Sequence, residues 1–273
     1  MYFKNRKEEK KVHKYLEKSR RICKQKQLLG LEIENLYDEG NYYLFEPKKK
    51  ECIIECWSQG YSLFEKNHNI LEHLTLNSLK KKIQVDLLCN KYDDIDNYFE
   101  QAFDYIEIGR FNQQTLFFNA SMYYLKAVYG LLSGEIDTEE IRKLIDMAGK
   151  YYVLMNNEKP YSIHFLYAKL AYREGRYQEM TDYYNNALQN ITKKHYYHDT
   201  IKKIILDDCC LKIGTLRNGC INYNINYNGF SEELVQVIRH IENVPIKELK
   251  KYLNSFRSIS NFTDQSQQEA FIF

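Results

Sequence analysis

The chain has 273 residues, of which 44% are hydrophobic and 28% are charged, and its 39 Lys and Arg residues nearly balance its 37 Asp and Glu residues. This length is enough to bury a sizeable core, but no apolar run approaches the roughly 18 residues of a membrane span. The basic N-terminus lacks the apolar stretch of a signal peptide, and the seven cysteines lack the spacing of a secreted disulfide scaffold. We therefore expect a soluble, cytoplasmic protein with free thiols.

Residues 1–26 are predicted to form a basic N-terminal helix. They contain eleven Lys or Arg residues and three Glu residues, so this segment carries a charge of about +8 and the remainder about −6. An apolar stripe on this helix is expected to dock on the next one, which leaves a basic face of Lys10, Lys14, Arg20 and Arg21. Such a face suits an acidic partner, anionic lipid or nucleic acid, or it only keeps a terminal helix solvated.

Residues 27–217 carry a helical pattern that recurs along the chain and is clearest in residues 165–188. Ala168 and Ala171 place small side chains on one stripe, and Gly175 ends that helix where a left-handed conformation is needed. The second helix then follows with Tyr177, Met180, Tyr184 and Ala187. The same offsets return as Tyr92, Ile95, Phe99 and Ala102 after a turn at Asn90. Poorer copies lie at residues 127–150, with Gly134 at the turn, and near 38–42.

These residues resemble a tetratricopeptide repeat (TPR). The resemblance implies an all-α fold of antiparallel helix hairpins stacked in a right-handed superhelix. More weakly, the chain resembles the peptide-pheromone-sensing regulators of Gram-positive bacteria and their phages, of the Rap and arbitrium-receptor types. That likeness rests on the irregular repeat length and on Tyr- and Asn-rich first helices such as residues 117–124. It implies a receptor that binds a short peptide, although the DNA-binding helix-turn-helix of many such regulators is missing from this sequence.

The first helix of each repeat is expected to line a concave groove. Amide side chains pair with the N–H and C=O groups of an extended peptide, and cationic side chains hold a carboxylate. The residues predicted to bind a peptide or protein segment are Asn77, Lys80, Gln84, Ser121, Tyr124, Phe165, Lys169, Tyr172 and Arg173. The function expected is therefore a non-enzymatic regulator or adaptor.

Two other functions stay open. One is a secretion or assembly chaperone that shields a partner's helix in the same groove. The other is a nucleic-acid-binding regulator that uses the basic N-terminal helix, with the repeats serving to form a homodimer, although no recognisable DNA-reading motif supports it.

The remaining segments offer little chemistry. Residues 218–229 are rich in Asn and Gly and are predicted to be an irregular linker rather than a strand, followed by C-terminal helices and a tail at 230–273. His195 and His198, with Cys209 and Cys210, match no reliable zinc spacing. No phosphate-binding glycine loop or nucleophile elbow is present, so we expect no enzyme activity, no metal and no cofactor.

Overall fold

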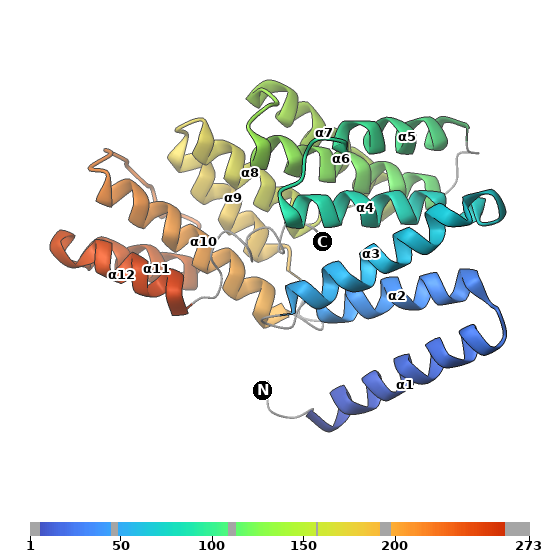
Figure 1. Cartoon of the computed structure of the whole chain (residues 1–273). Coiled ribbons are helices and arrows are strands. Elements are labelled where there is room, and N and C mark those ends of the chain that lie inside the picture. The colour runs from blue at the N-terminus through green and yellow to red at the C-terminus, as the bar shows by residue number, and fades with distance from the viewer. Residues whose placement is uncertain (1–5, 45–48, 109–112, 157, 192–197, 260–273) are drawn as a thin grey trace. The chain divides into compact units, whose positions relative to one another are not determined.

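The computed structural model describes residues 6–44, 49–108, 113–156, 158–191 and 198–259, except for the side chains of 6–13, 113, 156 and 255–259. Every regular element within these ranges is helical, which confirms the all-α fold class (Figure 1). The α-helices are α1 Arg6–Gln25, α2 Leu29–Tyr43, α3 Lys50–Lys66, α4 Thr75–Cys89, α5 Ile95–Ile108, α6 Gln113–Ser133, α7 Thr138–Asn156, α8 Tyr161–Arg173, α9 Tyr177–Gln189, α10 His198–Asn218, α11 Glu232–Asn243 and α12 Ile246–Ile259. Two 3-10 turns, η1 His68–Ile70 and η2 Glu72–Leu74, precede α4.

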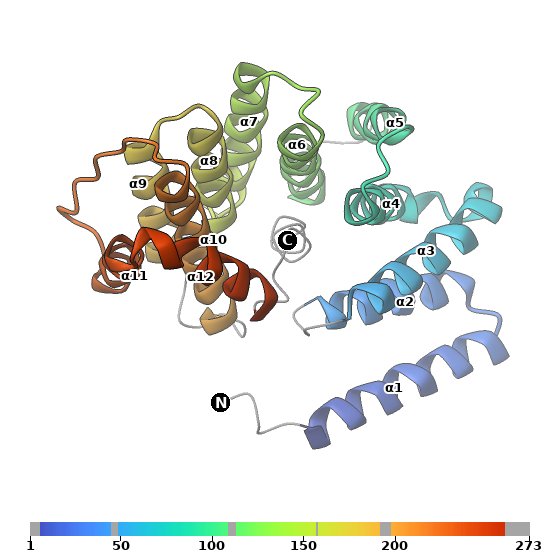
Figure 2. The same cartoon turned by 60° about the vertical axis from the view of Figure 1, so that its left-hand side comes forward.

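The chain forms two compact units, residues 1–105 and 106–273. Helices that follow one another in sequence pack together within each unit: α1 on α2, α2 on α3 and α3 on α4 in the first, and α6 on α7, α7 on α8 and α8 on α9 in the second. In Figure 2, α2 lies beside α3 in the first unit, and α6, α7, α8 and α9 follow one another from green to yellow in the second. The unit boundary therefore lies inside the segment that the sequence predicted to be one continuous array.

The turn residues predicted from the sequence have the expected backbone. Asn90 has φ of 54° and Gly175 has φ of 73°, both in the left-handed region. After α8, the N–H of Arg176 bonds the carbonyl of Ala171 at 2.8 Å and the N–H of Gly175 bonds that of Tyr172 at 3.1 Å. This pair of bonds satisfies carbonyls that the helix end would otherwise leave unpaired.

The N-terminal unit is built around Trp57, which is fully buried in α3. Its indole N–H donates to the carbonyl of Tyr37 at 3.1 Å, and the hydroxyl of Tyr37 donates to Ser78 at 2.9 Å. Gly40 lets α2 approach this ring, because a Cβ at that position would lie 2.2 Å from the indole nitrogen. A glycine is thus required at this helix contact for steric reasons.

The C-terminal unit places the predicted repeat positions in its core. Ala168, Met180, Tyr184 and Ala187 are fully buried, as expected for the facing stripes of two packed helices. The segment that joins α10 to α11 contains no helix or strand. The linker is followed by α11, whose first turn is capped by the hydroxyl of Ser231, which accepts a bond from the N–H of Leu234.

Candidate functional site

The predicted groove residues of α8 lie in three different environments. Phe165 is only 2% exposed. Tyr172 is half-buried, with the ammonium of Lys212 4.6 Å from its ring centroid. Arg173 is exposed, and its guanidinium donates a hydrogen bond of 3.1 Å to the carbonyl oxygen of Gly130. Tyr172 and Arg173 thus remain partly accessible, whereas Phe165 belongs to the core.

Lys169 lies in a buried polar network between α8 and α10. Its Nζ is 2.7 Å from Oδ1 of Asp208, and the two side chains are 7% and 1% exposed. The hydroxyl of Tyr184 donates to the other carboxylate oxygen of Asp208. Burial acts to raise the pKa of Asp208, but the charges of Lys169 and Lys212 outweigh it and hold that pKa below its usual value. The sequence predicted that Lys169 lines an open groove. Instead, its buried ion pair with Asp208 links α8 to α10.

The predicted residues of α6 also lie in the interior. Ser121 and Tyr124 are 3% and 2% exposed, and Ser121 is hydrogen-bonded to Tyr152. The hydroxyl of Tyr124 has no hydrogen-bond partner within the described part of the chain. Burial, with the nearby hydroxyls of Tyr161 and Tyr152, raises the pKa of Tyr124 well above its ordinary value.

The remaining three predicted residues belong to α4 and hence to the N-terminal unit. Asn77 and Lys80 are half-buried, and Gln84 is 2% exposed. Burial lowers the pKa of Lys80 to about 8. The nine predicted residues are thus divided between two separate units, and ligand binding by any of them stays a prediction.

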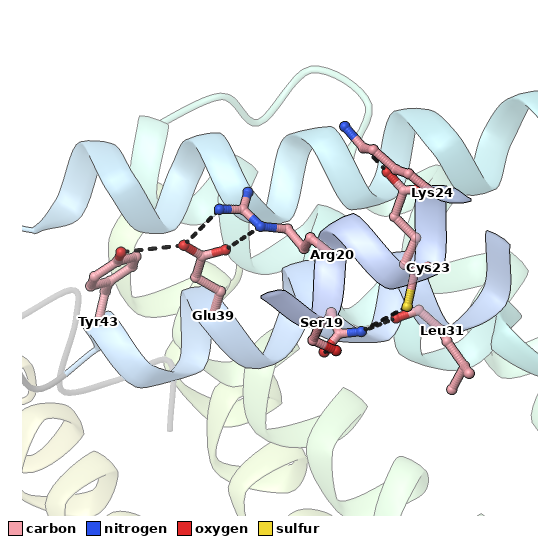
Figure 3. Close-up of polar contacts among 9 residues, drawn as sticks. Ser19, Arg20, Cys23, Lys24, Leu31, Glu39 and Tyr43 are labelled. Atoms are coloured by element: carbon pink, nitrogen blue, oxygen red, sulfur yellow. Dashed lines mark hydrogen bonds and ion pairs between the residues drawn. The ribbon is translucent and has the colours of Figure 1, made fainter. Parts of the chain in front are cut away.

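One member of the predicted basic face docks α1 on α2 (Figure 3). The Nε of Arg20 lies 3.3 Å from Oε2 of Glu39, a residue that is only 4% exposed. The hydroxyl of Tyr43 donates to Oε1 of the same carboxylate at 3.3 Å. Arg20 therefore neutralises a buried carboxylate, and its own side chain is 30% exposed.

The rest of that basic face is described in part. Lys14 and Arg21 are exposed on α1, as predicted. The side chain of Lys10 lies outside the described residues. Binding of an acidic partner by this basic face stays a prediction.

The N-terminal unit contains a cleft of about 680 Å³, a size typical of ligand sites. It lies where α3 ends, α4 begins and α5 passes beside them. Phe64 and Leu79 are its buried apolar residues. The other lining side chains are aromatic or polar: Tyr61, Glu65, His68, Asn69, Glu72, Thr75, Asn97, Tyr98, Gln101 and Tyr105.

Two tyrosines form an aromatic corner of this cleft. The rings of Tyr61 and Tyr98 meet edge to face, with centroids 6.2 Å apart. The ammonium of Lys82 lies 5.1 Å from the centroid of Tyr98 and 2.7 Å from Oδ1 of Asp86. Burial raises the pKa of Tyr61 above its ordinary value, so its hydroxyl stays protonated. The charge of Lys82 is neutralised within the protein, and the corner presents neutral rings and phenol hydroxyls.

Amides and carboxylates complete the cleft. Gln101 donates from Nε2 to Oδ1 of Asn97 at 3.2 Å, one turn apart on α5. Glu65 and Glu72 are exposed, and the Glu72 carbonyl accepts a 3.1 Å bond from the hydroxyl of Tyr105. These groups offer hydrogen-bond donors and acceptors beside negative charge.

The sequence-based search missed this cleft because it considered only the first helix of each repeat. A signal is nevertheless present on α5, where Tyr98, Gln101 and Tyr105 follow at steps of three and four residues. That spacing places them on one stripe, distinct from the buried stripe of Ile95 and Phe99. A second, polar–aromatic stripe on a predicted amphipathic helix therefore marks a candidate surface.

No protein-family model matches the chain, and no curated protein or solved structure matches it. Within the described ranges, no helix has both the length and the apolar character needed to cross a bilayer. The same ranges contain no group of three or more His, Cys, Asp or Glu side chains placed to hold a metal ion, and His195 lies outside them.

Proposed function

We propose that the protein is a non-enzymatic regulator or adaptor that binds a peptide segment in the cleft between α3 and α5. The observation that carries this proposal is the combination of tyrosine rings, side-chain amides and two carboxylates around one cleft of about 680 Å³. Aromatic rings supply contact area at low entropic cost, and amides pair with both backbone groups of an extended chain. Glu65 and Glu72 favour a peptide with a Lys or Arg side chain.

The repeat architecture belongs to the same proposal. Left-handed turns at Asn90 and Gly175 and the buried stripes that follow them support TPR-like hairpins. Stacking of such hairpins would give a right-handed superhelix, and a peptide-responsive regulator in the cytoplasm is the function that this architecture suits best.

Peptide selection followed by an affinity measurement tests the proposal. A random peptide library is selected on the full-length protein, and the dissociation constant of the best binder is measured by fluorescence anisotropy. Tyr98→Ala should weaken binding by roughly 2 kcal/mol, or about thirtyfold, because an aromatic anchor is lost. Unchanged affinity in this variant would overturn the assignment of the cleft.

The charge of the cleft has a matched control outside the cleft, on α5. Glu72→Gln should weaken the binding of a basic peptide and lower the salt dependence of that binding. Glu100→Gln removes the same charge from an exposed α5 position that does not line the cleft. Equal effects of the two substitutions would mean that only the net charge of the protein matters.

A further inference from the structure

The hairpin of α1 and α2 leaves large apolar side chains in water along one side. Tyr15 and Ile22 of α1 are 70% and 44% exposed, and Leu31 of α2 is 51% exposed. Tyr15 and Ile22 lie two helical turns apart on the same face of α1. These three residues form an apolar seam.

Hydrogen bonds between the helices fix which sides of α1 and α2 form this face. Ser19, between Tyr15 and Ile22 on α1, donates to Oδ1 of Asn35 at 3.0 Å, and Asn35 lies one turn after Leu31. Residues 19 and 35 therefore lie at the centre of the seam. The apolar side chains of both helices flank them on the same side of the hairpin.

Charges of opposite sign border the seam. On α1 the exposed cations Lys14, Lys18 and Arg21 follow the edge next to Tyr15 and Ile22. On α2 the exposed anions Glu34 and Asp38 lie three and seven residues after Leu31 and therefore share its face. The other side of the hairpin is already neutralised, because Arg20 pairs with Glu39 and Lys24 with Glu32.

We propose that this face is a self-complementary interface through which two copies of the chain associate. A twofold axis parallel to the helices places α1 of one copy opposite α2 of the other, so cations face anions and the two seams meet. Because Ser19 is level with Asn35, a rise of about 1.5 Å per residue puts Lys18 and Arg21 within about 3 Å of the height of Glu34. Lys14 falls within a similar distance of the height of Asp38.

The arrangement favours a second copy over an anionic membrane. A bilayer surface would attract the cations of α1 but repel Glu34 and Asp38 on the same face. The 15 residues of α2 limit the paired length to about 22 Å, so a face two helices wide buries roughly 900 Å² in total, which is at the lower limit of a specific interface. The expected dimer is weak and dependent on salt.

Charge exchange tests the interface by sedimentation velocity of the full-length chain. The acidic variant Lys18→Glu/Arg21→Glu and the basic variant Glu34→Lys/Asp38→Lys should each raise the dissociation constant of the dimer about tenfold or more. An equimolar mixture of the two should form a heterodimer with the wild-type affinity restored, because every reversed charge again meets its opposite. Wild-type dimerisation should also weaken as salt is added.

Two results would overturn the inference. One is a wild-type chain that stays monomeric at its highest soluble concentration, or a mixture that fails to associate. The other is a monomer that sediments with phosphatidylserine-containing vesicles and loses that binding in the acidic variant, which would assign the face to a membrane. Circular dichroism of both variants serves as the folding control, since exposed charges contribute little to stability.

Discussion

Removing the ammonium of Lys169 should destabilise the C-terminal unit strongly. Its partner Asp208 is 1% exposed at the side chain, and their atoms are 2.7 Å apart. Lys169→Met keeps most of the apolar stem but leaves a buried carboxylate with only Tyr184 and Lys212 to compensate it. Losing one partner of a buried pair costs about 3–5 kcal/mol. At roughly 2–4 °C per kcal/mol for a unit of this size, the thermal midpoint falls by about 6–20 °C.

Thermal and urea unfolding followed by circular dichroism measure this loss. Adding Asp208→Asn to Lys169→Met should restore a large part of the stability, because the amide still accepts the Tyr184 hydrogen bond without a charge. Lys143→Met is the matched control, since its side chain is 62% exposed in pairs with Glu139 and Glu140. An unchanged thermal midpoint for Lys169→Met would refute the buried ion pair and would mean that Lys169 lies on the accessible surface.

Three further changes test the fold. Gly40→Ala should lower the free energy of unfolding by about 1–3 kcal/mol, because the added methyl group collides with Trp57, whose fluorescence reports the change. Gly30→Ala is the control: its methyl group would make only ordinary contacts, so this substitution should be neutral or stabilising. Gly175→Val should cost about 1–3 kcal/mol in urea unfolding and Gly175→Asn much less, because φ is 73° there; equal losses would contradict the turn. Burial raises the pKa of Asp207 to about 6, so stability should fall as pH rises from about 4 to 6. Because solvent screens this partly exposed group, the expected loss is about 1–2 kcal/mol, and Asp207→Asn should remove that slope in pH-dependent unfolding.

Local turn chemistry made part of this fold predictable. A left-handed cap needs a residue that tolerates positive φ, so Asn90 and Gly175 marked helix ends without any knowledge of the rest of the chain. The stripe of Met180 and Tyr184 was equally readable, because its spacing alone fixes a common helix face.

Contacts between distant segments were not predictable in the same way. Lys169 was expected on a surface because its partner Asp208 lies 39 residues away, on a helix whose position the spacing does not reveal. The cleft is also built from distant segments. Its aromatic corner joins Tyr61 of α3 to Tyr98 of α5, 37 residues later, and the ammonium of Lys82 on α4 lies over both rings.

Photo-crosslinking tests peptide binding in the cleft most directly. A library-selected peptide carrying a benzophenone group is irradiated with the full-length protein, and the attachment sites are mapped by mass spectrometry. We predict attachment within α3 and α5, at or beside Tyr61, Tyr98 and Gln101. Attachment concentrated on α8, at Tyr172 or Arg173, would contradict the cleft and favour the groove that the sequence predicted.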